Sequence, residues 1–215
     1  MITFSDLGYG LIEPAMIEAL RPLVAGKVVW DLGPGSLNDE PIFLLRLGAR
    51  EVLAVDKEGP FRPDPTQPED QAVPRGVNGR LRRITTLFYN FATTVAASAS
   101  TPDTAPDTAP DTAAPDVAFL KWPSNVVSVG LPFLLSRAPI VVYIGLNDGR
   151  TACGDLWVWE HLHKRPLLCA IRGEKNDMLV YGPPVGVKPG PPRCREELNS
   201  PWGEKYYEEK PTDAC

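Results

Sequence analysis

The sequence predicts an α/β fold built on a mostly parallel sheet, and three observations support this prediction. Residues 28–56 contain a short apolar run, a glycine-rich turn, a helical pattern and a second apolar run that ends in an acid. Residues 117–120 and 139–145 are further short apolar runs, as expected of strands buried on both faces of a sheet. Residues 167–181 hold two apolar runs joined by a short segment with Gly and Asn, which predicts an antiparallel hairpin.

Length and composition indicate one soluble globular domain. The 215 residues suffice for a full hydrophobic core, and 43% are hydrophobic and 23% charged. The net charge of −5 argues against a general nucleic-acid coat, although it leaves room for a local basic patch.

The cysteines and the apolar segments predict a cytoplasmic protein. The four cysteines lack a CxxC spacing, so they imply neither a zinc site nor a disulfide framework: Cys153, Cys169, Cys194 and Cys215. Residues 1–11 show no signal peptide, and no stretch approaches the ~20 apolar residues of a membrane span.

The first quarter of the chain predicts two helices and two strands. Residues 14–20 predict a helix with Pro14 at its first position. Residues 28–30 then form a strand that meets a turn with the sequence Asp-Leu-Gly-Pro-Gly at 31–35. Ser36 or Asn38 can cap the following helix, and residues 51–55 form a second buried strand that closes on Asp56.

The order strand, glycine turn, helix, strand and acid predicts a nucleotide-binding unit. Ligands of open parallel sheets bind at the carboxyl ends of the strands, where the turn is expected. Asp56, some twenty residues after the turn, can accept hydrogen bonds from ribose hydroxyls. The Gly-x-Gly-x-x-Gly pattern of dinucleotide sites is incomplete, since Asn38 takes its third position. Asp31 would repel a pyrophosphate but suits a cation, and S-adenosylmethionine carries an ammonium and a sulfonium without a phosphate.

Residues 31–35 together with 52–56 resemble motifs I and II of the class I, seven-stranded, Rossmann-like S-adenosylmethionine-dependent methyltransferases. The resemblance implies a three-layer α/β/α sandwich whose seven-stranded, mostly parallel sheet ends in a C-terminal antiparallel hairpin. It also implies S-adenosylmethionine as cofactor, with its amino-acid part held by Asp31 and the backbone of Gly33 and Gly35, and its ribose by Asp56 beside Lys57. A Rossmann-like fold that binds NAD and a methyltransferase-like fold without activity remain alternatives.

Residues 57–79 contain five prolines and few apolar side chains, so they predict a long loop on the cofactor side of the sheet. Four arginines lie within nine residues and include no acid between them: Arg75, Arg80, Arg82 and Arg83. They predict either a solvated basic face or a contact for the phosphates of a nucleic-acid substrate.

Residues 81–91 predict the third strand. The resemblance implies that an acid or amide after this strand accepts a hydrogen bond from the adenine amino group, and that a neighbouring apolar side chain packs on the ring. Asn90 and Phe91 stand at those two positions. The repeat at 101–116, TPDTAPDTAPDTAAPD, has almost nothing to bury and predicts an extended linker without a catalytic role.

Residues 117–120 predict the fourth strand, and the four residues after it take the place of motif IV of the resembled family: Lys121, Trp122, Pro123 and Ser124. In amino-group methyltransferases this motif is Asp or Asn, then Pro, Pro and an aromatic residue, and it holds the target amine. Only Pro123 matches. A protonated Lys121 cannot accept a hydrogen bond from an amine, whereas Trp122 either stacks on a planar substrate or packs in the core.

The remaining patterns complete the predicted domain. They give a helix at 125–137, a strand at 139–145, a helix at 155–163 and the hairpin strands at 167–171 and 178–181. We therefore predict a methyltransferase-like domain at 1–183 and a proline-rich charged tail at 184–215. The predicted function is methyl transfer to an amine or oxygen of a nucleic acid, a protein or a small molecule; the sequence does not single out one acceptor.

Overall fold

The computed structural model describes residues 12–35, 38–56, 69–100, 113–123, 130–145, 156–174 and 176–184. Its helices are α1 (Pro14–Val24), α2 (Asp39–Arg46), α3 (Phe88–Ser100), α4 (Leu131–Ser136) and α5 (Leu156–Leu162). Its strands are β1 (Val28–Leu32), β2 (Glu51–Asp56), β3 (Glu69–Asp70), β4 (Arg80–Thr85), β5 (Val117–Lys121), β6 (Ile140–Gly145), β7 (Leu167–Arg172) and β8 (Asp177–Tyr181).

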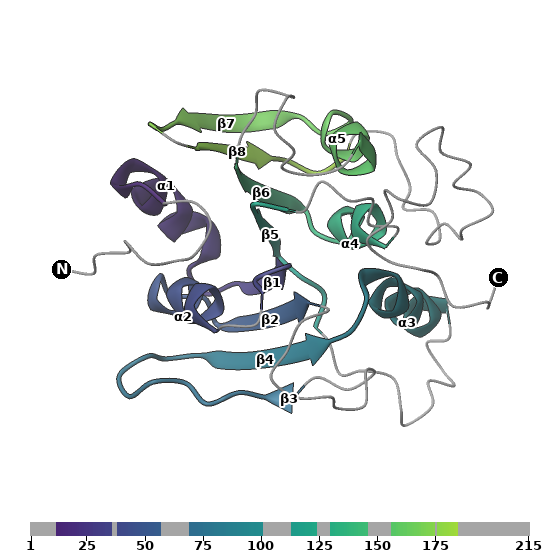
Figure 1. The fold of residues 1–215 in the computed structure, drawn as a ribbon, viewed down its shortest axis with the longest axis horizontal. Coiled ribbons are helices and arrows are strands. Elements are labelled where there is room, and N and C mark those ends of the chain that lie inside the picture. Colours follow the sequence, from purple (N-terminus) through teal and green to yellow (C-terminus); the bar gives the residue numbers. More distant parts are fainter. Residues whose placement is uncertain are drawn as a thin grey trace.

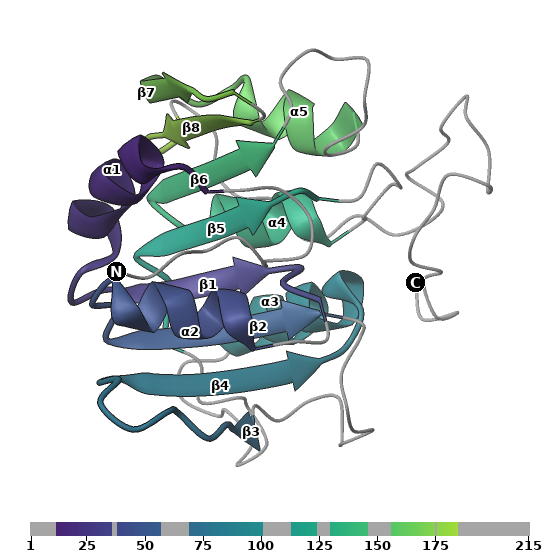
Figure 2. The same ribbon diagram turned by 60° about the vertical axis from the view of Figure 1, so that its left-hand side comes forward.

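One sheet joins all of these strands in the order β3-β4-β2-β1-β5-β6-β8-β7. The five strands from β4 to β6 run parallel, and β8 and β7 follow as an antiparallel pair. The arrowheads of the parallel strands point to one edge (Figure 2). This arrangement confirms the predicted fold class, including the terminal hairpin and the position of the fourth long strand, β5, beside the first. The short β3 adds an eighth strand to the seven that were predicted.

The helices form two layers, one on each face of the sheet. Figure 1 shows α1 and α2 on one side and α3, α4 and α5 on the other. Each layer has its own apolar cluster: Met16 and Leu20 of α1 pack with Phe43 of α2 on one face, and Phe91 of α3 packs with Leu134 of α4 on the other. The central strands β1, β2, β5 and β6 are therefore buried on both faces, which explains why they are continuous apolar runs.

Two details of the predicted elements are wrong. The loop predicted over 57–79 contains the short strand β3 among its described residues, paired antiparallel with β4. The third long strand, predicted over 81–91, ends at Thr85, and residues 88–100 form helix α3 instead. The sequence patterns predict no helix there.

The local chemistry explains why residues 88–100 are helical although they are rich in aromatic and β-branched side chains. Residues 88, 91, 92 and 95 are all buried and have the spacing of one helical face. The hydroxyls of Thr93 and Thr94 donate to the carbonyl oxygens of Tyr89 and Asn90, four residues earlier. The hydroxyls are thereby satisfied locally, and the buried face outweighs the strand propensity of these residues.

The predicted basic face is also wrong for two of its four arginines. Arg82 and Arg83 are each only 3% exposed, and Arg82 pairs with Glu51 of β2. The side chain of Arg80 is 50% exposed and donates to Asp70 of β3 at 2.7 Å. Because a phosphate contact requires exposed, available cations, the two buried arginines are unsuited to contact a nucleic acid.

No helix in the described part of the chain is long and apolar enough to cross a membrane. The division into a domain at 1–183 and a tail at 184–215 stays a prediction, because residues 185–215 lie outside the described residues.

A buried arginine ties the hairpin to the helix layer. Arg165, 4% exposed, precedes β7. Its Nη1 donates to the carbonyl oxygen of Gly182, and its Nη2 donates to those of Leu135 and Ala138 at the end of α4. One side chain thus satisfies three buried carbonyl groups from two distant segments.

We expect Arg165→Ala to lower the free energy of unfolding by about 3 kcal/mol, because three buried acceptors lose a charged donor. Urea unfolding followed by circular dichroism measures this change. Lys164→Ala, at the exposed neighbouring position, is the control and should stay within ~0.5 kcal/mol of the unsubstituted protein. Equal effects of the two substitutions would contradict the role assigned to Arg165.

Candidate functional site

Five ionisable side chains lie near the carboxyl ends of the parallel strands, on the face that α1 and α2 cover. Four come from strands: Asp31 of β1, Asp56 of β2, Arg83 of β4 and Lys121 of β5. Residues 29, 52, 81 and 119 of the same four strands belong to the apolar cluster under α1 and α2. The four ionisable residues lie an even number of positions after these, so their side chains are on the same face. The fifth, Glu40, comes from the first turn of α2.

The glycine turn after β1 joins this cluster through its backbone. Gly33 and Gly35 have φ angles of +89° and +78°, which favour glycine. The N–H of Gly33 donates to the carbonyl of Val55 at 2.9 Å, and the N–H of Gly35 donates to Oδ2 of Asp56 at 2.7 Å. The turn predicted at 31–35 and the acid at the end of β2 are therefore in direct contact.

Arg83 holds the same turn from the other side. Its Nη1 donates to the carbonyl oxygen of Gly35 at 2.8 Å, and its Nε and Nη2 donate to Oδ1 of Asn38. Asn38 is the N-cap residue of α2, but its side chain makes no capping bond to the helix. The arginine thus fixes the spacing between the turn and the start of α2, a role that the sequence did not predict.

Asp31 is fully buried, and neither of its carboxylate oxygens has a hydrogen-bond partner. It lies within β1, where it pairs with Ala54 and Phe119 in the two neighbouring strands. Burial raises the pKa of this carboxyl from 3.8 to about 8, although Lys121 and Arg83 act in the opposite direction. Buried polar groups are almost always bonded, so two unpartnered oxygens indicate a place for a donor ligand.

Lys121 and Glu40 form an ion pair across the gap between β5 and α2. Their side chains are 8% and 5% exposed, respectively. Burial lowers the pKa of the Lys121 ammonium, and Asp31 opposes that shift. Oε1 of Glu40, the oxygen that Lys121 does not hold, is buried and has no hydrogen-bond partner.

Trp122 leaves the sheet at the same edge but on the opposite face, where it packs against the cluster of α3, α4 and α5. Its indole N–H donates to Oδ1 of Asn176 at 2.9 Å, and its φ of +47° is the left-handed conformation that residues other than glycine rarely adopt. Such strain persists only where the surroundings enforce it and is common at functional sites. Pro123 beside it is buried.

The two residues predicted for the adenine lie in the first turn of α3. Phe91 is 3% exposed, and its ring packs on Trp30 at a centroid distance of 5.2 Å. The structure therefore does not bring Phe91 to the glycine turn. Phe88 is the aromatic residue at that turn, since a Cβ atom added to Gly33 would lie 3.7 Å from its Cζ.

Thr86 is the residue that follows the end of β4. Its Oγ1 is buried and has no hydrogen-bond partner.

Lys57 and Ser124, both predicted for the site, lie outside the described residues. Among the residues that are described, no group of three or more His, Cys, Asp and Glu side chains could hold a metal ion.

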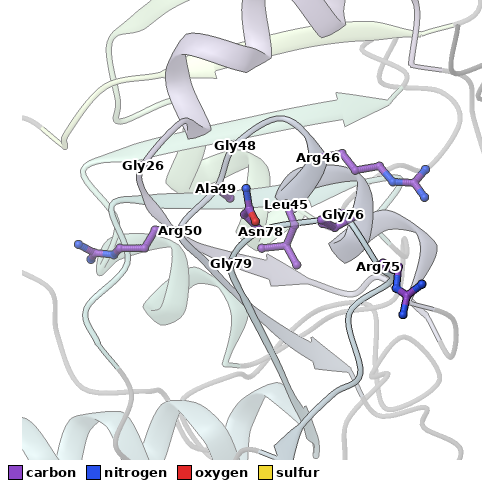
Figure 3. A pocket seen from close by; sticks show the side chains of 11 residues that line it. Gly26, Leu45, Arg46, Gly48, Ala49, Arg50, Arg75, Gly76, Asn78 and Gly79 are labelled. Carbon is purple, nitrogen blue, oxygen red and sulfur yellow. The ribbon is translucent and has the colours of Figure 1, made fainter.

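A hollow lies at the other end of the sheet. It has a volume of about 810 Å³ and opens at the amino ends of β1, β2 and β4. Figure 3 shows Arg46, Arg50 and Arg75 on its rim, with guanidinium groups that point away from the hollow. This hollow is separate from the candidate site because it lies at the amino ends of the strands, whereas ligands of open parallel sheets bind at the carboxyl ends.

Comparison with known proteins gives matches in structure alone. No family model matches the sequence, and no curated protein sequence matches it. A candidate RNA methyltransferase from Pyrococcus horikoshii aligns with 15% identity and a TM-score of 0.46, over 80% of this chain and 81% of that one. A ribosomal protein L11 methylase from Lactobacillus delbrueckii subsp. bulgaricus aligns with 14% identity and a TM-score of 0.47, over 84% and 83%.

An RNA methyltransferase from Salinibacter ruber, solved with S-adenosyl-L-homocysteine, aligns with 13% identity and a TM-score of 0.35, over 86% of this chain and all of that one. All three are described as methyltransferases, the family that residues 31–56 resemble. At these TM-scores the matches carry no weight for the chemistry, which depends on the geometry of the site.

The raised pKa of Asp31 predicts a stability cost in the ligand-free protein. Between pH 4 and pH 8 the carboxyl has lost its proton in the unfolded chain but keeps it in the folded one, so the free energy of unfolding falls as pH rises through this window. An asparagine side chain at this position cannot ionise. We therefore expect Asp31→Asn to raise Tm at pH 7.5 by about 2 °C or more, and by less at pH 5.

Differential scanning fluorimetry at the two pH values measures this difference. Asp70→Asn is a matched control, because Asp70 is exposed. A ligand-free Asp31→Asn protein that melts below the unsubstituted protein at pH 7.5 would refute the stability cost.

Proposed function

We propose that this protein is an S-adenosylmethionine-dependent methyltransferase. The observation that carries the proposal is the buried carboxylate of Asp31, whose two oxygens have no partner and which lies beside a glycine turn bonded to Asp56. These groups lie at the carboxyl ends of β1 and β2, and the strand order reverses next to them, between β1 and β5. That reversal is the ordinary place for a nucleotide ligand of a doubly wound sheet.

Each part of the proposed cofactor site has its own chemical task. Asp31 accepts hydrogen bonds from the ammonium of the cofactor, and the backbone of Gly33 and Gly35 allows its close approach. Asp56 accepts from the ribose hydroxyls, with Lys57 beside it. Phe88 and Thr86 take the tasks that were predicted for Phe91 and Asn90: an apolar surface and a polar contact for the adenine.

The bound cofactor supplies a methyl group on a sulfonium, which is already a good leaving group. The protein therefore needs to orient the acceptor in line with that methyl group and to exclude water, and it needs little acid–base catalysis. Trp122 and Pro123 follow β5 at the same edge, and we assign the acceptor to their side, with Ser124 next in the sequence. A strained, partly buried indole suits an acceptor with a planar group, and the acceptor atom is an amine nitrogen or an oxygen.

An NAD-dependent oxidoreductase fits this site less well. A pyrophosphate at the glycine turn would approach the carboxylate of Asp31, which burial already disfavours in its charged form. Charge repulsion would raise that cost further. A cationic ligand has the opposite effect, since it stabilises the ionised carboxylate.

A binding module without catalysis is the second candidate function. The observation that favours it is the ion pair of Lys121 with Glu40, because Lys121 stands where amino-group methyltransferases have an acid or amide. A lysine engaged in this way cannot accept a hydrogen bond from a target amine. This candidate predicts cofactor binding without methyl transfer to any acceptor.

Isothermal titration calorimetry with S-adenosylhomocysteine tests the proposed function, with NAD as the parallel ligand. We expect micromolar binding of S-adenosylhomocysteine alone. Asp31→Asn should weaken it at least tenfold while Tm stays at or above that of the unsubstituted protein, and Asp70→Asn should leave it unchanged. Binding of NAD alone, or of neither ligand, would refute the proposal.

A further inference from the structure

The ion pair of Lys121 and Glu40 has no role in the site as proposed so far, although it is among the most deeply buried pairs of charges in the described structure. Glu40 is 4% exposed as a residue, and the side chain of Lys121 is 8% exposed. Burying an ion pair costs about as much in desolvation as it gains in attraction, so such a pair is weak evidence for a stabilising role. The pair joins the end of β5, just before Trp122, to the helix after the glycine turn, so it lies next to both parts of the proposed site.

We propose that Lys121 and Glu40 recognise the amino-acid end of the cofactor. In this arrangement Glu40 and Asp31 accept hydrogen bonds from the α-ammonium, and Lys121 donates to the α-carboxylate. This inference rests on the proposed function. It moves Lys121 from the acceptor side of the site, where the sequence placed it, to the cofactor side.

The hydrogen-bonding capacity of the three side chains supports this assignment. Three buried carboxylate oxygens in this region have no partner: both oxygens of Asp31 and Oε1 of Glu40. An ammonium has three N–H donors, so one such group can satisfy all three oxygens. Lys121 likewise has three donors, and its bond to Oε2 of Glu40 leaves others for an anion.

The charges point to the same ligand. The cluster contains three carboxyl groups (Asp31, Glu40 and Asp56) and two cationic side chains (Arg83 and Lys121), which gives a net charge of −1 when all are ionised. S-adenosylmethionine carries an ammonium, a sulfonium and a carboxylate, so its net charge is +1. The complex is then neutral, which suits a buried site.

The position of Lys121 on the sheet explains how it can lie near both Asp31 and Glu40. Lys121 and Asp31 lie on the same face of adjacent strands, β5 and β1, and the charge of each affects the pKa of the other. Glu40 reaches Lys121 from the helix that covers this face. Trp122 faces the opposite side of the sheet, so consecutive residues serve the cofactor and the acceptor separately.

Two ligands that differ only in the amino-acid end test the inference. S-adenosylhomocysteine has it, and 5′-methylthioadenosine shares the adenosine and thioether but lacks both the ammonium and the carboxylate. Calorimetry on the full chain should show that Lys121→Met and Glu40→Gln each weaken S-adenosylhomocysteine at least tenfold. Each should change 5′-methylthioadenosine less than twofold. Lys27→Met, at an exposed position, should change neither ligand.

Removing one member of a buried pair can destabilise the fold, so the double variant Lys121→Met/Glu40→Gln provides a second measurement. It leaves no unpaired charge at these positions, and it should show the same selective loss with cooperative thermal unfolding. An unchanged ratio of the two affinities in the variants would overturn the inference while the proposed function stands. Failure of the unsubstituted protein to bind either ligand would overturn both.

Discussion

The structure depends on a concentration of charge at the carboxyl edge of its sheet, where desolvation is expensive. Asp31, Asp56, Arg83 and Lys121 lie on the face of the sheet that α2 covers, and Glu40 joins them from the first turn of α2. Most of this cost is offset internally: Arg83 bonds the turn and Asn38, Asp56 accepts from Gly35, and Lys121 pairs with Glu40. What remains is a set of carboxylate oxygens without partners, on Asp31 and Glu40. A protein selected for stability alone would replace such groups, so their presence points to a bound donor.

Much of the fold could be predicted from the sequence because parallel strands buried on both faces are short apolar runs. Glycines at 33 and 35 marked the turn, and the two apolar runs after residue 166 marked the hairpin. The end of β4 could not be placed, because Phe88 to Val95 has a composition typical of strands and only its 3.6-residue spacing of buried positions is helical. The sheet register decides such cases, and a single sequence does not contain it.

The sequence predicts those parts of the candidate site that belong to one continuous segment, but not the contacts between residues that are far apart in the sequence. Asp31, the two glycines and Asp56 belong to one continuous segment, and the structure brings them together. Arg83 was noticed only as a member of a basic cluster, and its burial depends on pairing of β4 with β2. The partner of Lys121 lies 81 positions earlier, on a helix, so no spacing rule connects the two residues.

The face on which each residue lies also gives the departure from motif IV a physical meaning. Lys121 ends β5 on the face that α2 covers, whereas Trp122, just after the strand, packs against the cluster on the opposite face, so the two side chains do not share one task. Lys121 points toward α2 and the acids of the cofactor side, and Trp122 points toward the layer of α3 to α5, where Asn176, just before β8, fixes its indole. A lysine at this position is incompatible with holding a target amine but compatible with an anionic group of the cofactor. Under the proposed function, Trp122 and Pro123 therefore position the acceptor through stacking and shape rather than through a carboxylate or amide. This arrangement favours an acceptor that needs no hydrogen-bond acceptor from the protein at the reacting atom.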